Sequence, residues 1–364
     1  MKAVVYYGEN DLRYEERKKP VIEPGAVLVR VKACSLCGSD LRTIRHGHAS
    51  IQEPRILGHE TVGVIEEVGE GVEGWKTGDR VAVTPGIGCG ECAYCRSGWQ
   101  NMCYKRKTIS QHYDGGFAEY VLVPPSAVKA GNINRIPDGT GFMEASLAEP
   151  LACVLNGQED LQIGDGDTVA VIGAGPIGIL HGMAARAAGA GKIILINRSS
   201  GRLKTARQFD FDAYIDLSRE DGVSRVLELT DGKGADDVIV AAGSKEALLS
   251  GMKMAAKMGK VCMFAGLPKN DPEVSIDVNA MHYRQVSLHG AFSSAPRHNA
   301  LALELIGSGK LKPQKIITHL VSLDKMMEGV ELAEGRAGLR VVISPCVQEL
   351  RQEAAAYDWI QVVE

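Results

Sequence analysis

The chain has 364 residues, with 45% hydrophobic and 24% charged side chains and a formal net charge of −4. A chain of this length exceeds one ordinary hydrophobic core and predicts two domains, with three as the alternative. The slightly negative net charge argues against a nucleic acid or an anionic membrane as a partner. No secretory signal is apparent, and no apolar stretch approaches the ~20 residues that a membrane helix needs. With nine cysteines, this pattern predicts a protein of the reducing cytoplasm.

The first 150 residues are expected to be rich in β-structure. Short apolar runs, separated by glycine and proline, are typical of strands joined by tight turns. We expect strands at Val27–Val31, Val62–Val68 and Arg80–Val83.

From about residue 155 the pattern changes to alternating strands and helices. Two helices are expected, at Pro176–Ala188 and Ser200–Phe209. The strands are expected at Thr168–Ile172, Lys192–Ile196, Asp237–Ala241, Lys260–Phe264 and Gln285–His289. This alternation predicts an α/β fold with a parallel sheet wound on both faces.

Beyond about residue 295 the alternation stops. Amphipathic helices are expected at Asn299–Ser308 and Asp324–Glu334, followed by a strand at Arg340–Ile343. The tail Ser344–Glu364 is an unassigned extension, expected to be helical around Gln348–Ala356.

Four cysteines occur within fifteen residues, at Cys89, Cys92, Cys95 and Cys103. Two consecutive CxxC steps and a fourth cysteine offer enough soft ligands to close a tetrahedral shell around one zinc ion. Zinc held by four thiolates has no open position, so this site is expected to be structural. An iron–sulfur cluster or two disulfides are the alternatives.

A glycine-rich turn, Gly173-Ala-Gly175-Pro-Ile-Gly178, follows the first expected strand of the alternating region and opens its helix. In this context it predicts a dinucleotide site, where the glycines allow the tight turn and the approach of a pyrophosphate. The helix N-terminus then offers free N–H groups to the phosphates. Besides the glycines, we expect the cofactor to contact Pro176, Ile177, Ala242 and Gly266.

The end of the second strand should discriminate between the two nicotinamide cofactors. A carboxylate there would accept the ribose hydroxyls and repel a 2′-phosphate. This chain instead places Asn197, Arg198 and Ser199 there, with Arg202 one helical turn later. A guanidinium can pair with a phosphate, so NADP(H) or dual use is favoured over strict use of NAD(H). The alternative is an exposed strand end with a surface arginine.

Separate segments carry a second set of metal-binding residue types. Cys37, the His59-Glu60 pair and Glu149, just before the expected cofactor domain, could together bind zinc with an open fourth position. Each fragment alone would be unremarkable, because His-Glu pairs are usually surface residues and a single cysteine usually belongs to the core.

Together these motifs resemble the zinc-dependent medium-chain dehydrogenase/reductase family, in its polyol (sorbitol) and threonine dehydrogenase branch. The motifs that carry the resemblance occur in the same order along the chain as in the family. They are Cys37–Asp40, Gly58–Gly63, Val68-Gly69, Gly78–Val81, the four cysteines, Gly115–Tyr120, Glu149–Ala152 and the glycines of the turn. The resemblance implies a GroES-like catalytic domain from residues 1–153 and 296–364, with a structural-zinc lobe at 88–104. It also implies a Rossmann NAD(P)-binding domain at 154–295 and a homo-oligomer, a dimer or a tetramer.

The resemblance also assigns roles. It makes Cys37, His59 and a glutamate the ligands of the catalytic zinc, and both Glu60 and Glu149 match glutamates that serve in this branch. Ser39 matches the hydroxyl that passes on the substrate proton. Many relatives complete this proton relay with a histidine, where this chain has Arg42. An arginine cannot shuttle protons near neutral pH, so either water and the ribose hydroxyl or a nearby histidine must substitute.

The segment after the zinc cysteine is basic, with Arg42, Arg45, His46 and His48. We expect a loop that could bind a phosphate or carboxylate of the substrate, or that is simply solvated.

The resemblance implies an oxidoreductase that acts on a secondary alcohol of a polyol or sugar derivative. A phosphorylated polyol or a threonine-type amino alcohol is the alternative substrate. A catalytically silent relative is a remote alternative, because such proteins usually lose the zinc ligands that this chain retains.

Overall fold

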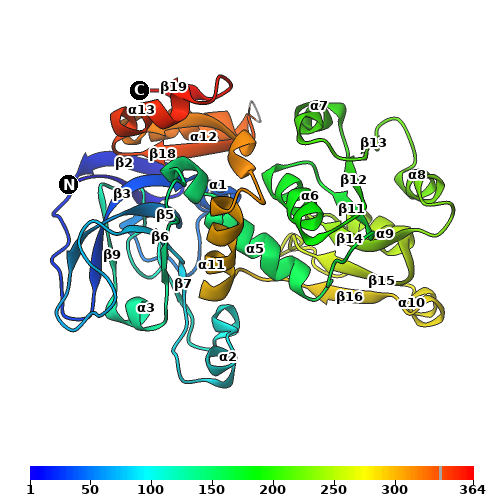
Figure 1. Ribbon diagram of the computed structural model, residues 1–364, viewed down its shortest axis with the longest axis horizontal. Helices are drawn as coiled ribbons and strands as arrows, with labels where there is room; N and C mark the ends of the chain where they lie inside the picture. Colours follow the sequence, from blue (N-terminus) through cyan, green and yellow to red (C-terminus); the bar gives the residue numbers. More distant parts are fainter. Residues whose placement is uncertain (336–337) are drawn as a thin grey trace. The chain divides into compact units, whose positions relative to one another are not determined.

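A computed structural model describes residues 1–335 and 338–364. The chain divides into two compact units (Figure 1). Unit 1 is formed from both ends of the chain, Met1–Ala152 and Ser293–Glu364, and unit 2 is the continuous segment Cys153–Phe292.

Unit 2 contains one six-stranded sheet in which every neighbouring pair is parallel. In spatial order the strands are β13 (Ala213–Asp216), β12 (Lys192–Asn197), β11 (Thr168–Ile172), β14 (Ala235–Val240), β15 (Ala255–Met263) and β16 (Ser287–Gly290). The chain enters the sheet at β11 and then builds outward on both sides of it. Ligands of such sheets bind at the carboxyl ends of the strands where the order reverses, here next to β11.

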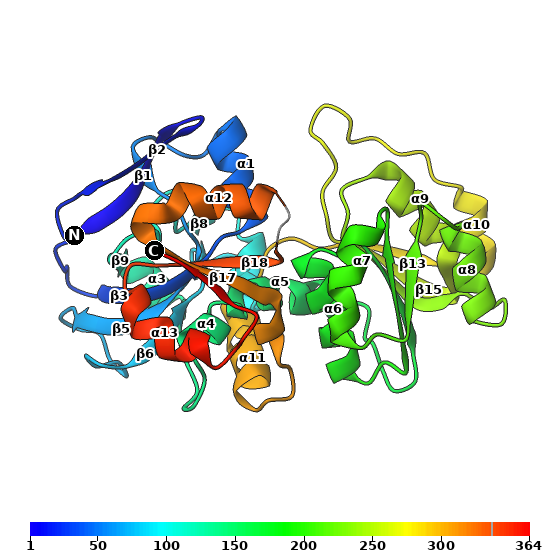
Figure 2. The same cartoon turned by 90° about the horizontal axis from the view of Figure 1, so that it is seen from above.

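Helices cover both faces of this sheet. In Figure 2, α6 (Pro176–Ala188) and α7 (Ser200–Ala206) lie on one side, and α8 (Gly222–Leu229), α9 (Lys245–Met254) and α10 (Val278–Arg284) on the other. The strands are apolar on both faces because both are covered; Val169, Ile193 and Val238, for example, are completely buried. The expected doubly wound α/β sheet is thus confirmed.

Unit 1 contains an eight-stranded sheet that joins the two ends of the chain. Its path is β10 (Ile133–Arg135), β6 (Arg80–Val83), β5 (Glu60–Val68), β3 (Val27–Ser35), β18 (Arg340–Ser344), β17 (Ile317–Ser322) and β19 (Gln361–Val363), and β9 (Tyr120–Val123) also pairs with β3. The antiparallel pair β3–β18 sets Ser35 opposite Val342. This pairing makes the C-terminal segment part of the same unit as the N-terminal strands.

Two smaller sheets complete the β-structure of unit 1. One contains β2 (Asp11–Glu16), β1 (Lys2–Gly8) and β4 (Arg55–Ile56), and the other pairs β7 (Gly86–Ile87) with β8 (Lys107–Thr108). Between the first sheet and the end of the large one lies a core that includes Tyr6, Ile44, Phe117, Val321 and Ile343. The β-rich structure that the sequence predicts for the first 150 residues is confirmed.

Unit 1 also contains several short helices. They are α1 (Gly38–His46), α2 (Ala93–Arg96), α3 (Pro125–Lys129), α4 (Phe142–Ala145), α11 (Pro296–Gly307), α12 (Met326–Glu334) and α13 (Val347–Ala355), and α5 (Ala148–Glu159) begins in this unit. The basic segment after Cys37, expected as a loop, is instead helical as far as His46. The C-terminal extension contains the expected helix and also strand β19, which the sequence did not predict. Over the described residues, no helix combines the length and apolar character that crossing a membrane requires.

Candidate active site

Three of the four residues expected around the catalytic metal lie together. Cys37 follows β3 and precedes α1, and His59 directly precedes Glu60, the first residue of β5. The antiparallel register of β3 and β5 sets Ser35 opposite Glu60, which brings these segments side by side. One ligand atom from each of Cys37, His59 and Glu60 lies within 4.8 Å of the others.

Asp40 orients two of these residues. Its Oδ2 accepts a hydrogen bond from the Cys37 backbone N–H at 3.0 Å, and its Oδ1 lies 3.2 Å from His59 Nδ1. If Nδ1 carries the proton, Nε2 is left as a free ligand atom. Asp40 is the last residue of the Cys37–Asp40 motif, but the motif alone predicts no role for it. Its position three residues after the cysteine, in the first turn of a helix, is the signal that could have identified it.

Glu60 is completely buried and forms an ion pair that the sequence does not reveal. Arg340 Nη2 donates to Glu60 Oε1 at 2.9 Å, while Arg340 Nη1 donates to the Leu36 carbonyl oxygen, also at 2.9 Å. The other carboxylate oxygen, Oε2, is buried and has no hydrogen-bond partner. An unpaired buried carboxylate oxygen is costly unless a cation is bound to it. This atom therefore fits the ligand of a metal ion.

The charges of the cluster shift the pKa values of its members. Burial would raise the pKa of the Cys37 thiol, but His59 and Arg340 lower it to about 7, which favours the thiolate. Burial raises the pKa of Glu60, although Arg340 opposes this effect. Burial alone would lower the pKa of His59, but Asp40 and Cys37 outweigh it and raise the pKa. A thiolate, an imidazole and a carboxylate are a suitable donor set for zinc.

The fourth expected ligand, Glu149, and the expected proton-relay residue, Ser39, are not members of this group. Ser39 Oγ lies 3.4 Å from His59 Nε2, and the Ser39 side chain is exposed. Glu149 lies in the first turn of α5 and is buried. Its ligand atoms are not grouped with those of Cys37, His59 and Glu60 among the described residues. Its charge nevertheless acts on the pKa values of both Glu60 and Arg340.

The four cysteines of the lobe form a second cluster, in which the sulfur atoms of Cys89, Cys92, Cys95 and Cys103 lie within 4.8 Å of one another. All four are free thiols rather than disulfides. Backbone N–H groups donate to the sulfurs, from Cys89 to Cys103 Sγ at 3.2 Å and from Cys92 to Cys89 Sγ at 3.4 Å. Hydrogen bonding from the Cys95 backbone N–H lowers the pKa of Cys92 to about 6. Backbone hydrogen bonds also lower the pKa of Cys89, whereas burial raises the pKa of Cys95 to about 12. Four sulfur atoms grouped in this way, two of them in surroundings that favour the thiolate, fit a closed zinc site.

The four-cysteine lobe is attached to α11. Arg297 lies over the ring of Trp99, with its guanidinium carbon 4.6 Å from the ring centroid. Arg297 Nε also donates to the Gly98 carbonyl oxygen at 3.2 Å. Just before α11, Ser293 Oγ accepts a hydrogen bond from Arg106 Nη2 at 3.0 Å. The lobe therefore holds the segment where the chain re-enters unit 1.

The glycine turn of unit 2 lies at the carboxyl end of β11, as expected. A Cβ atom on Gly178 would lie 1.7 Å from the Gly173 carbonyl oxygen, so the turn can close only with glycine there. Asn197, the last residue of β12, accepts a hydrogen bond from the Ala174 N–H at 3.2 Å. The turn leads into the N-terminus of α6, where backbone N–H groups without an intrahelical partner can bind a phosphate.

The other expected cofactor residues gather at the same edge of the sheet. Arg202 Nη1 would lie 3.4 Å from a Cβ atom on Gly175, so its guanidinium lies next to the glycine turn. The Ala242 backbone N would lie 3.5 Å from a Cβ atom on Gly173, and the Gly266 carbonyl oxygen 2.6 Å from one on Gly243. Arg198 and Ser199 are exposed beyond the end of β12.

The basic residues near Cys37 differ in their surroundings. The Arg45 guanidinium forms two hydrogen bonds with the Glu334 carboxylate, at 2.7 and 2.5 Å, and one with Asn10 Oδ1 at 2.9 Å. His48 Nδ1 accepts from the Ser50 N–H at 3.2 Å. Arg42 and His46 lie on α1 with exposed side chains. Arg45 is thus already paired within the protein, unlike the substrate contact that the sequence suggested for it.

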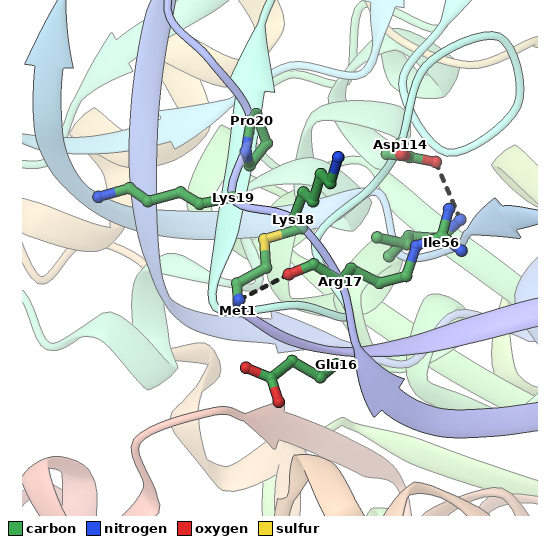
Figure 3. A pocket seen from close by; sticks show the side chains of 8 residues that line it. All are labelled: Met1, Glu16, Arg17, Lys18, Lys19, Pro20, Ile56 and Asp114. Atoms are coloured by element: carbon green, nitrogen blue, oxygen red, sulfur yellow. Dashed lines mark hydrogen bonds between the residues drawn. The ribbon is translucent and has the colours of Figure 1, made fainter.

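A pocket of about 520 Å³ lies elsewhere in unit 1 (Figure 3). It includes none of the expected site residues. Its lining residues are Met1, Glu16, Arg17, Lys18, Lys19, Pro20, Ile56 and Asp114.

Comparison with known proteins finds similarity over both units. The chain matches the alcohol dehydrogenase GroES-like domain over residues 23–133 and the zinc-binding dehydrogenase model over residues 176–308. It is 33% identical over 354 residues to a sorbitol dehydrogenase from Halalkalibacterium halodurans, which covers 95% of the chain and 99% of the relative. It is 30% identical over 351 residues to D-xylulose reductase A from Aspergillus oryzae, with 94% and 96% covered.

Solved structures of dehydrogenases are also similar to this chain over most of its length. A zinc-binding dehydrogenase from Sinorhizobium meliloti bound to NADP has a TM-score of 0.87 at 31% identity, covering 94% of this chain and 99% of that one. An alcohol dehydrogenase from E. coli with NADH has a TM-score of 0.86 at 28% identity, covering 94% and 99%. Galactitol-1-phosphate dehydrogenase from Escherichia coli has a TM-score of 0.86 at 25% identity, covering 95% and 100%.

Proposed function

The chain belongs to the zinc-containing medium-chain alcohol dehydrogenase family, and we propose that it transfers hydride between NADP(H) and a secondary alcohol of a polyol or sugar derivative. The observation that carries this proposal is the cluster of Cys37, His59 and Glu60, with ligand atoms within 4.8 Å of one another. Three protein ligands leave a coordination position open, as in catalytic zinc sites. The four-cysteine site fills every position, which suits a structural role.

The chain's own residues would hold this zinc. Zinc bound there supplies a Lewis acid that polarises the substrate oxygen. Cys37 and His59 are two proposed ligands, and Glu60 is the third, since its Oε2 is buried and unpaired. Glu149 is the alternative, supported by its buried place in the first turn of α5. Asp40 would keep the His59 ring in the orientation and tautomer that binding needs.

Ser39 is proposed to move the substrate proton. In the direction of oxidation, the substrate hydroxyl loses its proton to Ser39 Oγ, which passes its own proton to water. A nicotinamide bound in unit 2 would supply the hydride acceptor, and loss of hydride from the carbinol carbon would leave a carbonyl group. The exposure of Ser39 supports direct transfer to solvent. Arg42 cannot extend this relay because a guanidinium keeps its proton, so His46 or His48 is the alternative route.

The residues at the end of β12 support NADP(H) as the preferred cofactor. Asn197 carries no charge to repel a 2′-phosphate. Arg198 is exposed there, and the Arg202 guanidinium lies beside the glycine turn. The Sinorhizobium meliloti relative, at 31% identity, was solved with NADP bound. Dual use of NAD(H) is the alternative, and the E. coli relative was solved with NADH.

The relatives support a polyol substrate, because they include a sorbitol dehydrogenase and a D-xylulose reductase. A phosphorylated polyol is the second candidate. It is favoured by the exposed basic side chains of Arg42 and His46, and one structural relative is a galactitol-1-phosphate dehydrogenase.

The proposed enzyme is a cytoplasmic homo-oligomer with a catalytic domain at 1–153 and 296–364 and a cofactor domain at 154–295. Light scattering on the purified protein would test the oligomeric part.

A panel of kcat/KM values tests the proposal. Polyols, their phosphates and amino alcohols are each assayed with both cofactors, and zinc is counted per subunit. We expect the highest kcat/KM with an unphosphorylated polyol and NADP(H), and two zinc ions per subunit. A higher value for phosphates would establish the second candidate. No turnover on any alcohol, with the catalytic site empty of zinc, would contradict the proposed function altogether.

A further inference from the structure

We propose that Glu353, in the C-terminal extension, is a positioning residue that holds α4 and, through it, the segment that carries Glu149. The inference rests on the proposed function only in giving Glu149 a role at the catalytic metal. It assigns a task to an extension for which the sequence motifs offered none.

The Glu353 carboxylate binds the N-terminus of α4 directly. Its Oε2 accepts the Phe142 N–H at 3.0 Å and its Oε1 accepts the Met143 N–H at 2.6 Å. Residue 141, which precedes α4, is a glycine and has no side chain to cap the helix. A helix leaves its first N–H groups without partners unless an outside acceptor satisfies them. Glu353 provides that acceptor from 211 residues further along the chain.

The fit around this cap is close. A Cβ atom on Gly141 would lie 2.2 Å from Glu353 Oε1, so a side chain at position 141 would displace the carboxylate. On the same side, the Tyr357 hydroxyl donates to Glu144 Oε1, which ties the end of the extension to α4 as well. Leu350 and Ala354 are buried and anchor α13 itself. The extension therefore meets α4 with two polar contacts and a packed helix behind them.

From α4 the contacts continue to the metal cluster. Ser146 Oγ donates to the Met143 carbonyl oxygen at 2.7 Å and lies 2.9 Å from Ser35 Oγ. Ser35 precedes Cys37 by two residues and lies opposite Glu60 in the sheet. The end of α4 is thereby attached to the last residue of β3, two residues before Cys37 and opposite Glu60 on β5.

On its other side, α4 leads almost directly into α5. The Leu147 N–H donates to the Glu144 carbonyl oxygen at 3.0 Å, and Ala148 and Glu149 follow as the first residues of α5. A helix of four residues does not form by itself, because nucleation is unfavourable and tertiary contacts must stabilise it. Removing the cap should therefore loosen residues 142–149 as a unit, and with them the placement of Glu149.

The test compares Glu353→Ala with Gln352→Ala, an exposed neighbour on the same helix. Hydrogen exchange of the peptide 140–149 and the rate of catalytic-zinc loss to a chelator are measured on the full-length protein. Neither readout requires turnover, so an error in the proposed substrate would leave both interpretable. We expect exchange and zinc loss to become about tenfold faster in Glu353→Ala, within the range seen for residues that support metal ligands, and to stay native in Gln352→Ala. Glu353→Gln, which keeps one acceptor oxygen, should recover part of both effects.

A double-mutant cycle with Glu149→Gln tests the route of the effect. If Glu353 acts through Glu149, Glu353→Ala should accelerate zinc loss little further in the Glu149→Gln background. Native exchange of 140–149 in Glu353→Ala would overturn the proposal, as would fully additive effects on zinc loss. If Glu353→Ala does not fold, the same cycle is run with Glu353→Gln, and the same outcomes decide.

Discussion

Arg340 and Glu60 form a buried ion pair, with Arg340 Nη2 at 2.9 Å from Glu60 Oε1 and side-chain exposures of 5% and 0%. The arginine is the first residue of β18 and the glutamate the first residue of β5. The pair joins the C-terminal segment to the strand that carries a proposed zinc ligand. It also leaves Glu60 Oε2 as the only oxygen of this carboxylate that is free to bind a metal.

Replacing Arg340 should destabilise the protein strongly. In the protein stripped of zinc, Arg340→Met leaves the Glu60 charge buried and unpaired, which typically costs about 3–5 kcal/mol. The free energy of unfolding, measured with urea, should fall by that amount. Arg340→Met combined with Glu60→Gln should recover part of the loss, because no buried charge is then left alone. A single variant as stable as the wild type would contradict this account of the pair.

Asp40→Asn should weaken metal binding at the catalytic site. The substitution removes the negative charge beside His59 Nδ1, and partners of this kind typically contribute about 10–100-fold in metal affinity. Competition with a chelator measures the affinity. Asp138→Asn is the matched control, because it makes the same change at an exposed aspartate outside the metal cluster and should leave the affinity unchanged. Equal affinities in Asp40→Asn and the wild type would remove Asp40 from the site.

Arg198→Ala should raise the KM for NADP by about tenfold, since a hydrogen bond to a charged group contributes about 1.5–3 kcal/mol. The KM for NAD should change little, because NAD has no 2′-phosphate. Lys204→Ala is the control, since Lys204 is an exposed cation on the adjoining helix α7. Initial rates with both cofactors give the comparison. Equal changes for NADP and NAD would reject the role of Arg198.

His181 should make unit 2 sensitive to acid. Its side chain is completely buried, Gln158 Nε2 lies 3.2 Å from its Nδ1, and burial lowers its pKa to about 3. The imidazole of His181 takes up a proton near pH 6.5 in the unfolded chain but only near pH 3 in the folded chain. The contribution of His181 to the free energy of unfolding is therefore fully present above pH 6.5 and is lost as the pH falls from 6.5 to 3. The contribution to the slope is about 1.4 kcal/mol per pH unit.

Urea unfolding between pH 7 and pH 4 tests this slope. His181→Leu has no imidazole to titrate, so its stability should fall less steeply with acid, whatever its stability at pH 7. Parallel curves for the variant and the wild type would show that other groups dominate the acid response.

Cys92→Ser should affect assembly and stability before it affects the chemistry. Losing one of four thiolates should reduce the metal content by about one zinc per subunit and lower the melting temperature. Cys346→Ser, which changes a cysteine outside both clusters, should keep both zinc ions. Native zinc content and melting in Cys92→Ser would refute the structural-zinc interpretation.

The sequence was most informative where a motif is local. The four cysteines and the glycine turn each lie within one short segment, so spacing alone predicted that their members meet. Arg340 could not be found this way, because its partner Glu60 is 280 residues away and the pairings of β3 with both β18 and β5 bring them together.

Helix α1 and strand β19 were missed for local reasons. In α1 the only large apolar residues are Leu41 and Ile44, too few to show a helical period over nine residues. Strand β19 has three residues, and its pairing with β17 comes from tertiary contacts rather than from its own pattern. The choice between Glu60 and Glu149 likewise depends on side-chain placement, which no spacing in the sequence encodes.

The stacking of Arg297 on Trp99 provides an optical probe inside the protein. The chain has three tryptophans, and Trp99 directly precedes the short helical turn that ends before Cys103. Trp75 lies beneath Arg135 and Trp359 beside Tyr357, so each ring has a different environment. A form of the protein that retains Trp99 alone would emit from the lobe only. Its fluorescence would follow metal loading and release at the four cysteines in real time, without a label and without substrate.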